Sequence, residues 1–557
     1  MIETAGDTLA VQQAAGSKVS SVRAVGTRAV LAELAGTGEV LALQALLLEQ
    51  PLPGQLDVLA AAQTVLVTAD SPVAARRIAA RLLQLDLTAP VHRDGGLVVI
   101  DTVYDGEDLA EVGELTGLGS DGVIAAHTGQ VWTVAFAGFA PGFGYMVGEN
   151  QALEVPRRSS PRTAVPAGSV ALAGNYSAVY PRRSPGGWQL IGRTGAKMWD
   201  LDREQPALAA PGQRVQFRAV RATVTLAAKQ PAHTPAPEVT SGLRIVSPGL
   251  QSLIQDLGRF GHSGLGVSAA GALDRASLRR ANRLVGNAPS AAAVETVAGG
   301  LTVQAVGDQV LAVTGAPAEL TIETPGGDDS GPAERTVPMA TPFALLDGET
   351  LAIGAPHSGF RSYLAVRGGV DTPPVLGSRS TDTMSGIGPA PLAAGQHLAA
   401  GGEAESGVVG HPELQPDFPY AGVTVLDVVP GPRADWFDAD ALASFCSQDW
   451  DVKPQSNRVG MRLQGTPLQR TRQGELASEG TVAGAVQVPP EGLPVLFLAD
   501  HPITGGYPVI AVVVDSQLDR AAQVPIGGKI RFRWVPDEIT AAAAAPEHAT
   551  PEQEASN

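Results

Sequence analysis

Short apolar runs separated by glycine and proline make up most of this chain. Near the N-terminus the alternating run VRAVGTRAVLAEL is followed by LDVLAAAQTVLVTA, by SPVAARRIAARLLQL and by a second alternating run, GGLVVIDTVY. Alternation is typical of strands with one buried face, whereas the spacing in SPVAARRIAARLLQL is typical of an amphipathic helix. This order predicts a small α+β domain over 21–110.

The following block is richer in turns. EDLAEVGELTGL and SDGVIAAHTG have the apolar faces of helices, and SVALAG and WQLIGRT have the pattern of short strands within a Gly/Pro-rich stretch. Short strands with frequent turns favour a closed barrel. We therefore expect a β-barrel over 111–227.

From Leu243 to Val535 short alternating runs dominate again, among them LTVQAV, SYLAVRGG, VTVLDVVPG and KIRFRWV. This spacing favours β-barrels or sandwiches over a parallel α/β fold. Two helices interrupt it, in ALDRASLRRANRLVG and RADWFDADALASFC. The Gly-rich, acidic GGEAESGVVGHPEL divides the block into β domains over 242–410 and 411–536, which could be related to each other although no exact repeat links them.

Composition narrows the class of protein. At 557 residues the chain should form three or more domains, and 44% hydrophobic with 17% charged residues is typical of a soluble globular protein. A net charge of −17 argues against nucleic acid as a partner, and no apolar run is long enough to span a membrane. The N-terminus lacks the pattern of a secretion signal, and the single cysteine, Cys446, excludes a disulfide framework. We expect a cytoplasmic location.

Three segments have the composition of connections and tails. Residues 1–20 are small and polar, 228–241 are rich in proline and alanine, and 537–557 are rich in alanine and charge. Such segments rarely bury enough apolar surface to fold. The prediction is a disordered extension, a linker and a disordered tail.

Positive charge is concentrated where the chain is richest in glycine and proline, between Phe136 and Thr194. The arginines of this stretch are Arg157, Arg158, Arg162, Arg182, Arg183 and Arg193. Tight turns leave backbone N–H groups free for a ligand, and guanidinium groups bind carboxylate or phosphate. The stretch therefore indicates a rigid anion-binding surface. The alternative is that the turns only close a barrel and that Arg182 or Arg183 is merely solvated.

Other familiar chemistries are not visible. The sequence has no GxxxxGK[ST] loop, no HExxH and no CxxC, which argues against a Walker-type nucleotide site and against a zinc site. Only five lysines occur, none in an AMKM-like biotin attachment sequence. The chain is not expected to carry biotin.

Several motifs carry a family resemblance. FAGFAPGFGYMVG and PRTAVPAGSVALAGNYSAVYPRRSPGGWQLIGRT resemble the family of 5-oxoprolinase B subunits, also described as KipI or allophanate hydrolase subunit 1. The second block resembles the 5-oxoprolinase C subunits, or KipA, in GLQSLIQDLGR, LGVSAAGALDRASLRRANRLVGN, SYLAVRGGVDTPPVLGSRST, NRVGMRLQG and LASEGTVAGAVQVPPEGLPVLFLADHPITGGYP. The chain thus resembles a natural fusion of the two proteins, and both halves resemble the carboxyltransferase region of urea carboxylase.

The resemblance implies both a fold and an activity. The fold would be mainly β, with cyclophilin-like β-barrel domains in both halves and an N-terminal α+β domain. The activity would be ATP-dependent opening of 5-oxo-L-proline to L-glutamate, with Mg²⁺ and with a separate LamB/YcsF-type protein as the A component. Two alternatives stay open: a carboxyltransferase component acting on urea or another amide, and a KipI-like kinase-inhibiting binding protein. A homo-oligomer is also compatible with the resemblance.

The resemblance also suggests roles for residues of the first block. Arg162 and Arg193 would hold phosphate or carboxylate oxygens, and Asn175 and Tyr180 would hydrogen-bond the substrate amide. The PGFGY turn, with Gly142 and Tyr145, would line the pocket. The family usually has proline at the position of Gly144, and a looser turn there could alter the pocket.

In the second block the polar candidates are Gln255, Asp256, Arg259, His262, Asp274, Arg379, Asn457, Arg458, Glu479, Asp500 and Thr504. His262 could shuttle protons, since its pKa in the absence of perturbation lies near neutrality. Glu479 and Asp500 could act as a general base or bind Mg²⁺, or could simply cap turns. Asp274 is equally well explained as the N-cap of the predicted helix.

Overall fold

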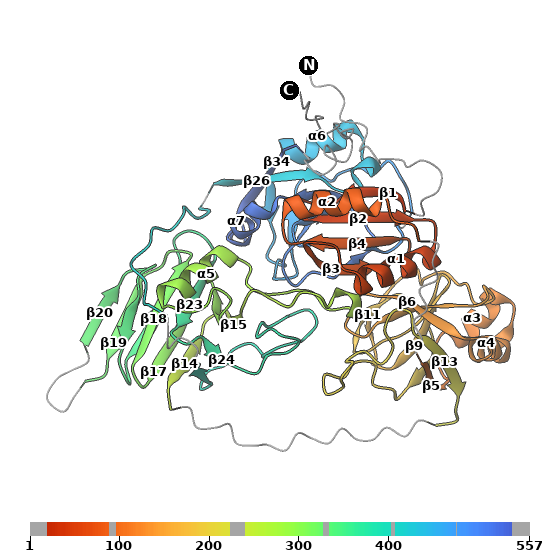
Figure 1. The fold of residues 1–557 in the computed structure, drawn as a ribbon, viewed down its shortest axis with the longest axis horizontal. Coiled ribbons are helices and arrows are strands. Elements are labelled where there is room, and N and C mark those ends of the chain that lie inside the picture. Colours follow the sequence, from red (N-terminus) through yellow and green to blue (C-terminus); the bar gives the residue numbers. More distant parts are fainter. Residues whose placement is uncertain are drawn as a thin grey trace, which may run out of the picture.

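The computed structural model describes residues 19–87, 96–222, 240–326, 333–402, 407–420, 422–474 and 476–536. The predicted N-terminal extension and linker lie outside the described residues except for their last two residues, and the predicted tail lies wholly outside them. The described chain forms an N-terminal domain, a first barrel, a two-sheet domain and a second barrel (Figure 1). No helix in the described part is long and apolar enough to cross a membrane.

The N-terminal domain is an antiparallel sheet in the order β1-β2-β4-β3 with two helices. Its elements are β1 (Val19–Ala24), β2 (Ala29–Leu34), α1 (Thr37–Glu49), β3 (Gln55–Ala60), β4 (Thr64–Ala69) and α2 (Pro72–Leu82). Helix α2 begins with Ser71 as its N-cap, which accepts a hydrogen bond from the backbone N–H of Ala74, and with proline at its first position. The predicted α+β domain is present, with α1 as a helix that the pattern did not indicate.

Both faces of this sheet are buried. Along β2, Val30 belongs to the core shared with the helices, whereas Leu31 belongs to a cluster that includes Phe497 and Val512 of the second barrel. Because successive side chains of a strand point to opposite faces, a sheet covered on both sides needs apolar residues at nearly every position. This explains why 58–60 of β3 and 65–67 of β4 are apolar at successive positions, and the shared burial fixes the N-terminal domain against the second barrel.

The first barrel has seven strands in the closed order β10-β7-β6-β13-β5-β12-β9. They are β5 (Leu97–Val103), β6 (Trp132–Ala137), β7 (Gly144–Gly148), β9 (Ser169–Ala173), β10 (Tyr176–Val179), β12 (Gln189–Thr194) and β13 (Arg214–Ala219). Two helices, α3 (Leu109–Thr116) and α4 (Gly119–Thr128), and a pair of short strands, β8 (Arg162–Val165) and β11 (Ser184–Gly186), complete the unit. The barrel and both predicted helices are confirmed.

One boundary prediction is wrong. Strand β5 was expected in the α+β domain over 21–110, but it lies in the barrel, where it pairs in parallel with β13. The two strands are separated by more than a hundred residues in sequence, so local alternation could identify β5 as a strand but not its partner.

The two-sheet domain follows from residue 242 to residue 400. Its larger sheet contains β14 (Gly242–Pro248), β17 (Leu301–Val306), β19 (Leu320–Thr324), β20 (Ala333–Val337), β22 (Thr350–Ile353), β24 (Val370–Asp371) and β25 (His397–Ala400). The smaller one contains β15 (Gln251–Gln255), β16 (Ala293–Val297), β18 (Gln309–Gly315), β21 (Phe343–Leu345) and β23 (Arg361–Val366). The sheets share one core, and the predicted helix α5 (Arg275–Leu284) packs on the other face of the smaller sheet.

The second barrel is closed in the order β26-β33-β30-β31-β28-β27-β34. Its strands are β26 (Val423–Pro430), β27 (Trp450–Val452), β28 (Gly460–Gln464), β30 (Ala485–Gln487), β31 (Val495–Phe497), β33 (Val509–Val513) and β34 (Lys529–Trp534), with the short pair β29 (Glu479–Gly480) and β32 (Thr504–Gly505). The single helix predicted in RADWFDADALASFC is two elements, a 3-10 turn η2 (Ala434–Trp436) and α6 (Ala439–Ser447). The break falls at Asp438, which is the N-cap of α6 and accepts from Ala441 N. A further 3-10 turn, η3 (Asp515–Gln517), leads into α7 (Leu518–Ala522).

The two barrels repeat one plan. Taken from β5 and from β26, the strands occur in the same chain order and the same spatial order, and each barrel adds one pair of short strands. The outer ion pairs Arg218–Asp101 and Arg533–Asp427 join equivalent strands, and in both barrels a tryptophan indole donates to the carbonyl five residues before it at 2.9 Å. The related domains are therefore one barrel from each half, and not the two parts of the second block.

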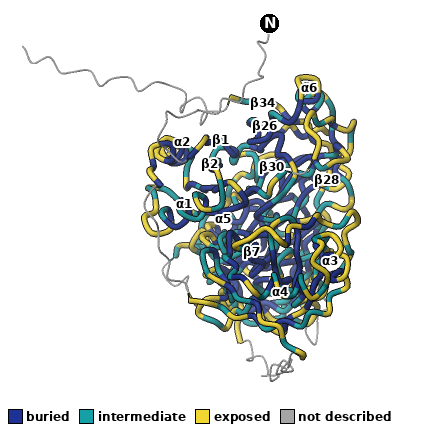
Figure 2. Tube along the Cα trace, turned by 90° about the vertical axis from the view of Figure 1, so that its right-hand side faces the viewer, coloured by how far each residue is buried: buried dark blue, intermediate teal, exposed yellow. Residues whose placement is uncertain are grey.

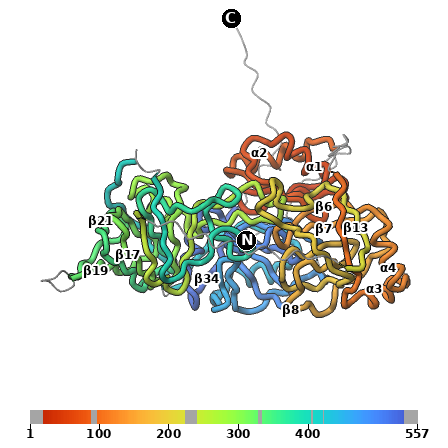
Figure 3. The backbone as a smooth tube through the Cα atoms, turned by 90° about the horizontal axis from the view of Figure 1, so that it is seen from below, coloured from red at the N-terminus to blue at the C-terminus, as the bar shows by residue number. Residues whose placement is uncertain are grey.

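Figures 1 and 3 show the two-sheet domain at one end of the molecule and the first barrel at the other, with the N-terminal sheet stacked on the second barrel. Burial is concentrated along the strands, whereas the outer helices and loops are exposed (Figure 2). Two long segments of the two-sheet domain, 255–274 and 375–390, leave their sheets and run toward the barrels (Figure 1). These segments position the site.

Candidate active site at the junction of the two halves

The FAPGFGY turn of the first barrel docks directly on the second half. Gly142 N donates to the carbonyl of Leu265 at 3.2 Å. A Cβ at Gly266 would lie 2.4 Å from the carbonyl oxygen of Ala140, and Gly266 has φ +86°, so this contact requires glycine. The turn that the sequence predicted as a pocket wall thus forms one side of the junction between the halves.

The segment 255–259 is held by a carboxylate. Asp256 accepts hydrogen bonds from Gly258 N at 2.8 Å, Ser378 Oγ at 2.6 Å, Arg379 N at 2.6 Å and Ser380 Oγ at 2.5 Å. Beside it, Gln255 donates to the carbonyl of Thr381 at 2.9 Å. The predicted candidates Gln255 and Asp256 therefore lie together, and they hold the segments 255–259 and 378–381 against each other.

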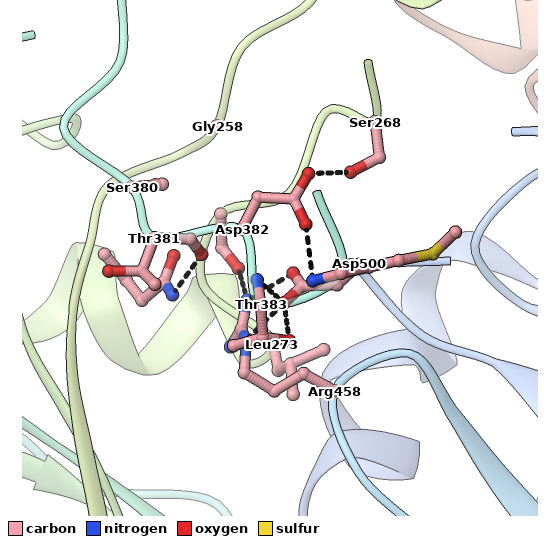
Figure 4. Close-up of polar contacts among 12 residues, drawn as sticks. Gly258, Ser268, Leu273, Ser380, Thr381, Asp382, Thr383, Arg458 and Asp500 are labelled. Carbon is pink, nitrogen blue, oxygen red and sulfur yellow. Dashed lines mark hydrogen bonds and ion pairs between the residues drawn. The ribbon is translucent and has the colours of Figure 1, made fainter. Parts of the chain in front are cut away.

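A second carboxylate, Asp382, lies where the segment 375–390 reaches the barrels (Figure 4). It is almost fully buried and accepts from Ser268 Oγ at 2.9 Å, from the backbone N–H groups of Met384 at 2.9 Å and Ser385 at 3.0 Å, and from Ser385 Oγ. Its donors come from two loops that belong to one domain, which makes the position rigid.

Asp500 and Arg458 join the second barrel to this loop (Figure 4). Asp500 accepts from Thr383 N at 2.9 Å, Thr383 Oγ1 at 2.6 Å, and two guanidinium nitrogens of Arg458 at 3.0 and 2.9 Å. Arg458 also donates to Glu295 of β16 and, at 2.6 Å, to the carbonyl of Gly271. One guanidinium thus ties the second barrel to the two-sheet domain.

The charges in this network are nearly balanced. Burial raises the pKa of Asp500, and Arg458 opposes that effect. Burial alone would also raise the pKa of Glu295, but Arg458 and Arg361 hold it below its usual range. Ion pairs taken out of water in this way add little net stability but are costly to break, because the remaining charge is left buried alone.

A small cavity of about 10 Å³ lies between the first barrel and this network. Phe139, Pro141 and Arg182 line it from the first barrel, and Ser268, Asp382, Met384, Ser385, Gly266, His501, Pro502 and Ile503 line it from the second half. Among the described residues, no acceptor lies within hydrogen-bonding distance of the buried Arg182 Nε. Arg259 Nη1 is likewise buried without an acceptor there, but Arg259 lines neither cavity. Burial lowers the pKa of Arg182, and Asp382 opposes this shift. An unpartnered donor beside a carboxylate forms a site that can accept a polar ligand atom or a water molecule.

His501 separates the small cavity from a large one. Its imidazole stacks on Phe497 with ring centroids 5.8 Å apart, and its Nδ1 lies 2.9 Å from the carbonyl oxygen of Pro502, which fixes Nδ1 as the protonated nitrogen. Burial lowers the pKa of His501, so the ring is neutral near pH 7. His501 lines both cavities.

The large cavity has a volume of about 430 Å³ and lies among the N-terminal domain, the segment 257–275 and the second barrel. Its lining combines apolar side chains with arginines and aspartates from all three parts. A cavity of this size is typical of a small-molecule site. The junction therefore offers a polar pocket for one or two atoms and, across His501, space for a whole ligand.

Several predicted residues lie elsewhere. Arg162 pairs with Asp108 at 2.7 Å, and Asp108 also accepts from Arg158 and from the backbone N–H of Leu190, both at 2.7 Å. Arg193 pairs with Asp105 at 2.9 Å. Carboxylates of the first barrel itself bind these guanidinium groups, so an external anion would have to replace these ion pairs. The predicted role of Arg162 and Arg193 in binding an anion stays a prediction.

The other first-block candidates are parts of the barrel. Asn175 is exposed in the turn between β9 and β10. Tyr145 and Tyr180 are buried in an aromatic cluster with Phe143 and Trp188, and neither tyrosine lines the cavities. Their burial raises the pKa of both phenols.

Glu479 belongs to an ion network at the interface with the N-terminal domain. Both its carboxylate oxygens accept from Arg433, which also binds Glu33 of β2 at 2.6 Å, and Glu33 in turn binds Arg23 of β1 at 3.1 Å. Its carboxylate is therefore occupied in holding domains together, and the predicted role as a general base stays untested.

The remaining candidates shape turns or helix ends. Asp274 is the N-cap of α5 and accepts from Ser277 N at 2.8 Å, as the alternative explanation expected. Asn457 Oδ1 accepts from Val459 N at 2.9 Å, and Arg379 donates to the carbonyl of Thr372. His262 precedes the 3-10 turn η1 (Ser263–Leu265), and Thr504 is buried on β32.

Sequence reasoning missed part of the junction. Arg182 was counted among the arginines of the expected anion-binding surface, with solvation of Arg182 or Arg183 as the alternative, but it was not chosen as a site residue. Asp382, Ser385 and His501 were not singled out, although the last lies next to a chosen aspartate. Nothing in the local pattern separates Arg182 from Arg183, since both lie in the same YPRRSP turn. Only the docking of the first barrel on the second half buries one of them.

Comparison with known proteins first defines the class. The family model "Carboxyltransferase domain, subdomain C and D" matches residues 20–209, and the model "Carboxyltransferase domain, subdomain A and B" matches residues 265–534. The two halves that meet at the junction are therefore carboxyltransferase-type units, in the order C/D and then A/B.

The relatives identify the family more closely. The chain is 38% identical over 293 residues to the C subunit of 5-oxoprolinase from Escherichia coli (strain K12), covering 52% of the chain and 90% of that relative. It is 36% identical over 198 residues to the B subunit of 5-oxoprolinase from Bacillus subtilis (strain 168), covering 32% of the chain and 82% of that relative. The chain belongs to the carboxyltransferase-domain family that includes the 5-oxoprolinase B and C subunits, and it joins both kinds of unit.

Two further similarities are informative. The crystal structure of TTHA0988 superposes with a TM-score of 0.78 at 34% identity and covers 91% of this chain and 99% of its own, so that protein also contains both units. Urea amidolyase of Saccharomyces cerevisiae is 32% identical over 313 residues, which is 52% of this chain but only 16% of that enzyme.

Proposed function

We propose that this chain is the fused B and C component of an ATP-dependent 5-oxoprolinase, which opens 5-oxo-L-proline to L-glutamate together with a separate LamB/YcsF-type component. The observation that carries the proposal is the junction itself. Relatives named as B and C subunits cover most of their own length on this chain, and loops from both halves meet around two cavities.

The reaction suits a site that positions and polarises its ligands. A lactam is a poor electrophile, and transfer of the γ-phosphoryl group of ATP to its carbonyl oxygen activates the ring carbon and leaves ADP. Water then adds to that carbon, the C–N bond breaks as the nitrogen takes a proton, and a second water hydrolyses the acyl phosphate to glutamate and phosphate. Such chemistry depends mainly on fixed donors and charges.

The junction supplies groups of this kind. Arg182 offers a buried N–H donor for a developing oxyanion, and the neutral imidazole of His501 is suited to accept a proton from attacking water. Asp382 is held by two serines and two backbone N–H groups, so it stays in place while a ligand binds.

In this proposal Mg²⁺ enters with the nucleotide. Within the described ranges, no group of three or more His, Cys, Asp or Glu side chains is placed to hold a metal ion. Mg²⁺ is commonly held by substrate phosphates together with one or two carboxylates, so a dedicated metal cluster is not required.

A second candidate function is carboxyl transfer to urea or a related amide. It is favoured by the carboxyltransferase family models and by the similarity to urea amidolyase. This function would need a biotin carboxylase and a biotin carrier from other chains.

Release of ADP that depends on 5-oxoproline tests the proposal. The full chain is mixed with a LamB/YcsF-type component, ATP and Mg²⁺, and ADP and glutamate are measured with and without 5-oxoproline. We expect one ADP for each glutamate. Release of ADP that is the same without 5-oxoproline would contradict the proposal, and dependence on urea and carboxybiotin would support the second candidate.

A further inference from the structure

Two arginines that line the large cavity form no ion pair with the described residues. Arg275 is the first residue of α5 and Arg279 follows one turn later, so both lie on the same face of the helix and both line the cavity, the first half-buried and the second exposed. Among the described residues, no carboxylate or carbonyl lies within ion-pair or hydrogen-bonding distance of either guanidinium. Arg275 lies over the ring of Phe260, 5.4 Å from its centroid, which holds the side chain in place without neutralising it.

The acceptors of the same cavity, in contrast, are already occupied. Asp57 accepts from Gly261 N at 3.0 Å and from Ser263 Oγ at 2.7 Å, and Asp515 pairs with Arg28 at 3.1 Å. Asp70 accepts from Ser71 Oγ at 2.8 Å. Each of these carboxylates has a donor from the protein.

The fourth carboxylate of the cavity lining, Asp519, also has donors from the protein. It accepts from the backbone N–H groups of Arg275 at 2.8 Å and Ala276 at 3.3 Å, so it already occupies the N-terminus of α5. Burial lowers the pKa of Arg275, and Asp515 and Asp519 oppose this shift without forming an ion pair with it. The groups without an ion-pair or hydrogen-bond partner are therefore the two guanidiniums, whereas Asp519 occupies the backbone N–H groups at the start of α5.

We infer that Arg275 and Arg279 form an oxyanion-binding position of the large cavity, which takes the carboxylate or phosphate group of a small ligand. Arginine forms two parallel hydrogen bonds to either group, and the apolar residues Leu59, Leu66 and Phe497 would contact the remainder of the ligand. The choice between the carboxylate of 5-oxoproline and a phosphate of ADP or ATP rests on the proposed function. The presence of an oxyanion position does not depend on the proposed function.

The test is direct binding to the full chain without the LamB/YcsF-type component. Inorganic phosphate, 5-oxoproline and ADP are each titrated by calorimetry into the wild type, Arg275→Gln, Arg279→Gln and the control Arg81→Gln, whose arginine lies on α2 outside the cavity lining. We expect at least one of the three ligands to bind the wild type and the control equally, and to bind each cavity variant about 10- to 100-fold more weakly.

The ligand that shows the loss identifies the source of the oxyanion: 5-oxoproline alone indicates the carboxylate, and ADP with phosphate indicates the nucleotide. Arg279→Lys keeps the charge but not the planar pair of N–H donors, so it should bind the ligand more weakly than the wild type and more tightly than Arg279→Gln. The lysine variant replaces the glutamine variant in the test if the latter does not fold. Equal binding by the wild type and both glutamine variants, or no binding of any of the three ligands to the wild type, would overturn the inference. If a ligand binds in the calorimetry as expected but the ADP-release assay fails, the result counts against the proposed function alone.

Discussion

Removal of the Arg458 guanidinium should destabilise the contact between the second barrel and the two-sheet domain more than any other single change in the described network. Arg458→Gln leaves Asp500 and Glu295 buried without their shared counter-ion, and it also removes the hydrogen bond to the carbonyl of Gly271. Breaking a buried ion pair by removing one partner costs about 3–5 kcal/mol. We expect a loss of that size near pH 7.5, measured as a shift in the urea midpoint.

The pH dependence provides a second, independent check. Burial already raises the pKa of Asp500, and without Arg458 it rises further. The pKa of Glu295, which Arg458 and Arg361 hold low in the wild type, rises as well, so the folded variant holds protons that the unfolded chain has released. The stability of the variant therefore falls as pH rises above about 4, and its deficit relative to the wild type is smaller at pH 5 than at pH 7.5.

The matched control is Arg462→Gln, which removes an exposed arginine from the neighbouring strand β28. We expect this change to stay within about 0.5 kcal/mol of the wild type. Arg458→Gln with Asp500→Asn should be less destabilising than the sum of the single changes, because the second substitution removes a stranded charge. A deficit for Arg458→Gln that matched the control and did not change with pH would refute the reasoning.

Three further predictions concern other parts of the molecule. Burial raises the pKa of Asp519 to about 6, so this group should lower the stability of the wild type by up to about 3 kcal/mol as pH rises from 4 to 6, and urea titrations of Asp519→Asn should lack that fall. Gly266→Ala should weaken docking of the first barrel, because its Cβ would lie 2.4 Å from the carbonyl oxygen of Ala140; faster proteolysis between the halves would show this, and unchanged proteolysis would argue against it. Arg162→Gln should cost about 1–2 kcal/mol through its pair with the buried Asp108 and leave phosphate binding unchanged, so weaker phosphate binding would restore the anion-site prediction for Arg162.

Much of the architecture could be predicted because it depends on local patterns. Alternation identified some of the strands of both barrels, and the apolar spacing of ALDRASLRRANRLVG identified α5 with Asp274 as its cap. The predictions that failed concern strands and domains whose partners lie far apart in the chain. Strand β5 was assigned to the wrong domain because its neighbour β13 follows more than a hundred residues later, and the relation between the two barrels is visible only in their strand order.

The candidate site divides in the same way. Asp256 was identified within the polar group of QDLGR, and Asp500 was identified as a carboxylate near the end of a predicted strand. Both are buried in the junction. Arg162 also stood out, but its partner Asp108 lies more than fifty residues earlier and neutralises it. Arg182 has no sequence feature that distinguishes it, since its burial beside Asp382 comes from packing between the halves.

If both halves contribute to one active site at the junction, a substitution on either side must impair the same reaction. Release of ADP that depends on 5-oxoproline is measured, in the presence of the LamB/YcsF-type component, for the wild type, for Arg182→Gln in the first half, for Asp382→Asn in the second half and for the control Arg81→Gln. We expect the control to match the wild type, and each junction variant to lose about 100-fold in kcat/KM, which corresponds to about 2.7 kcal/mol, while the urea midpoint of Arg182→Gln changes little. Full activity in both junction variants would contradict a shared site.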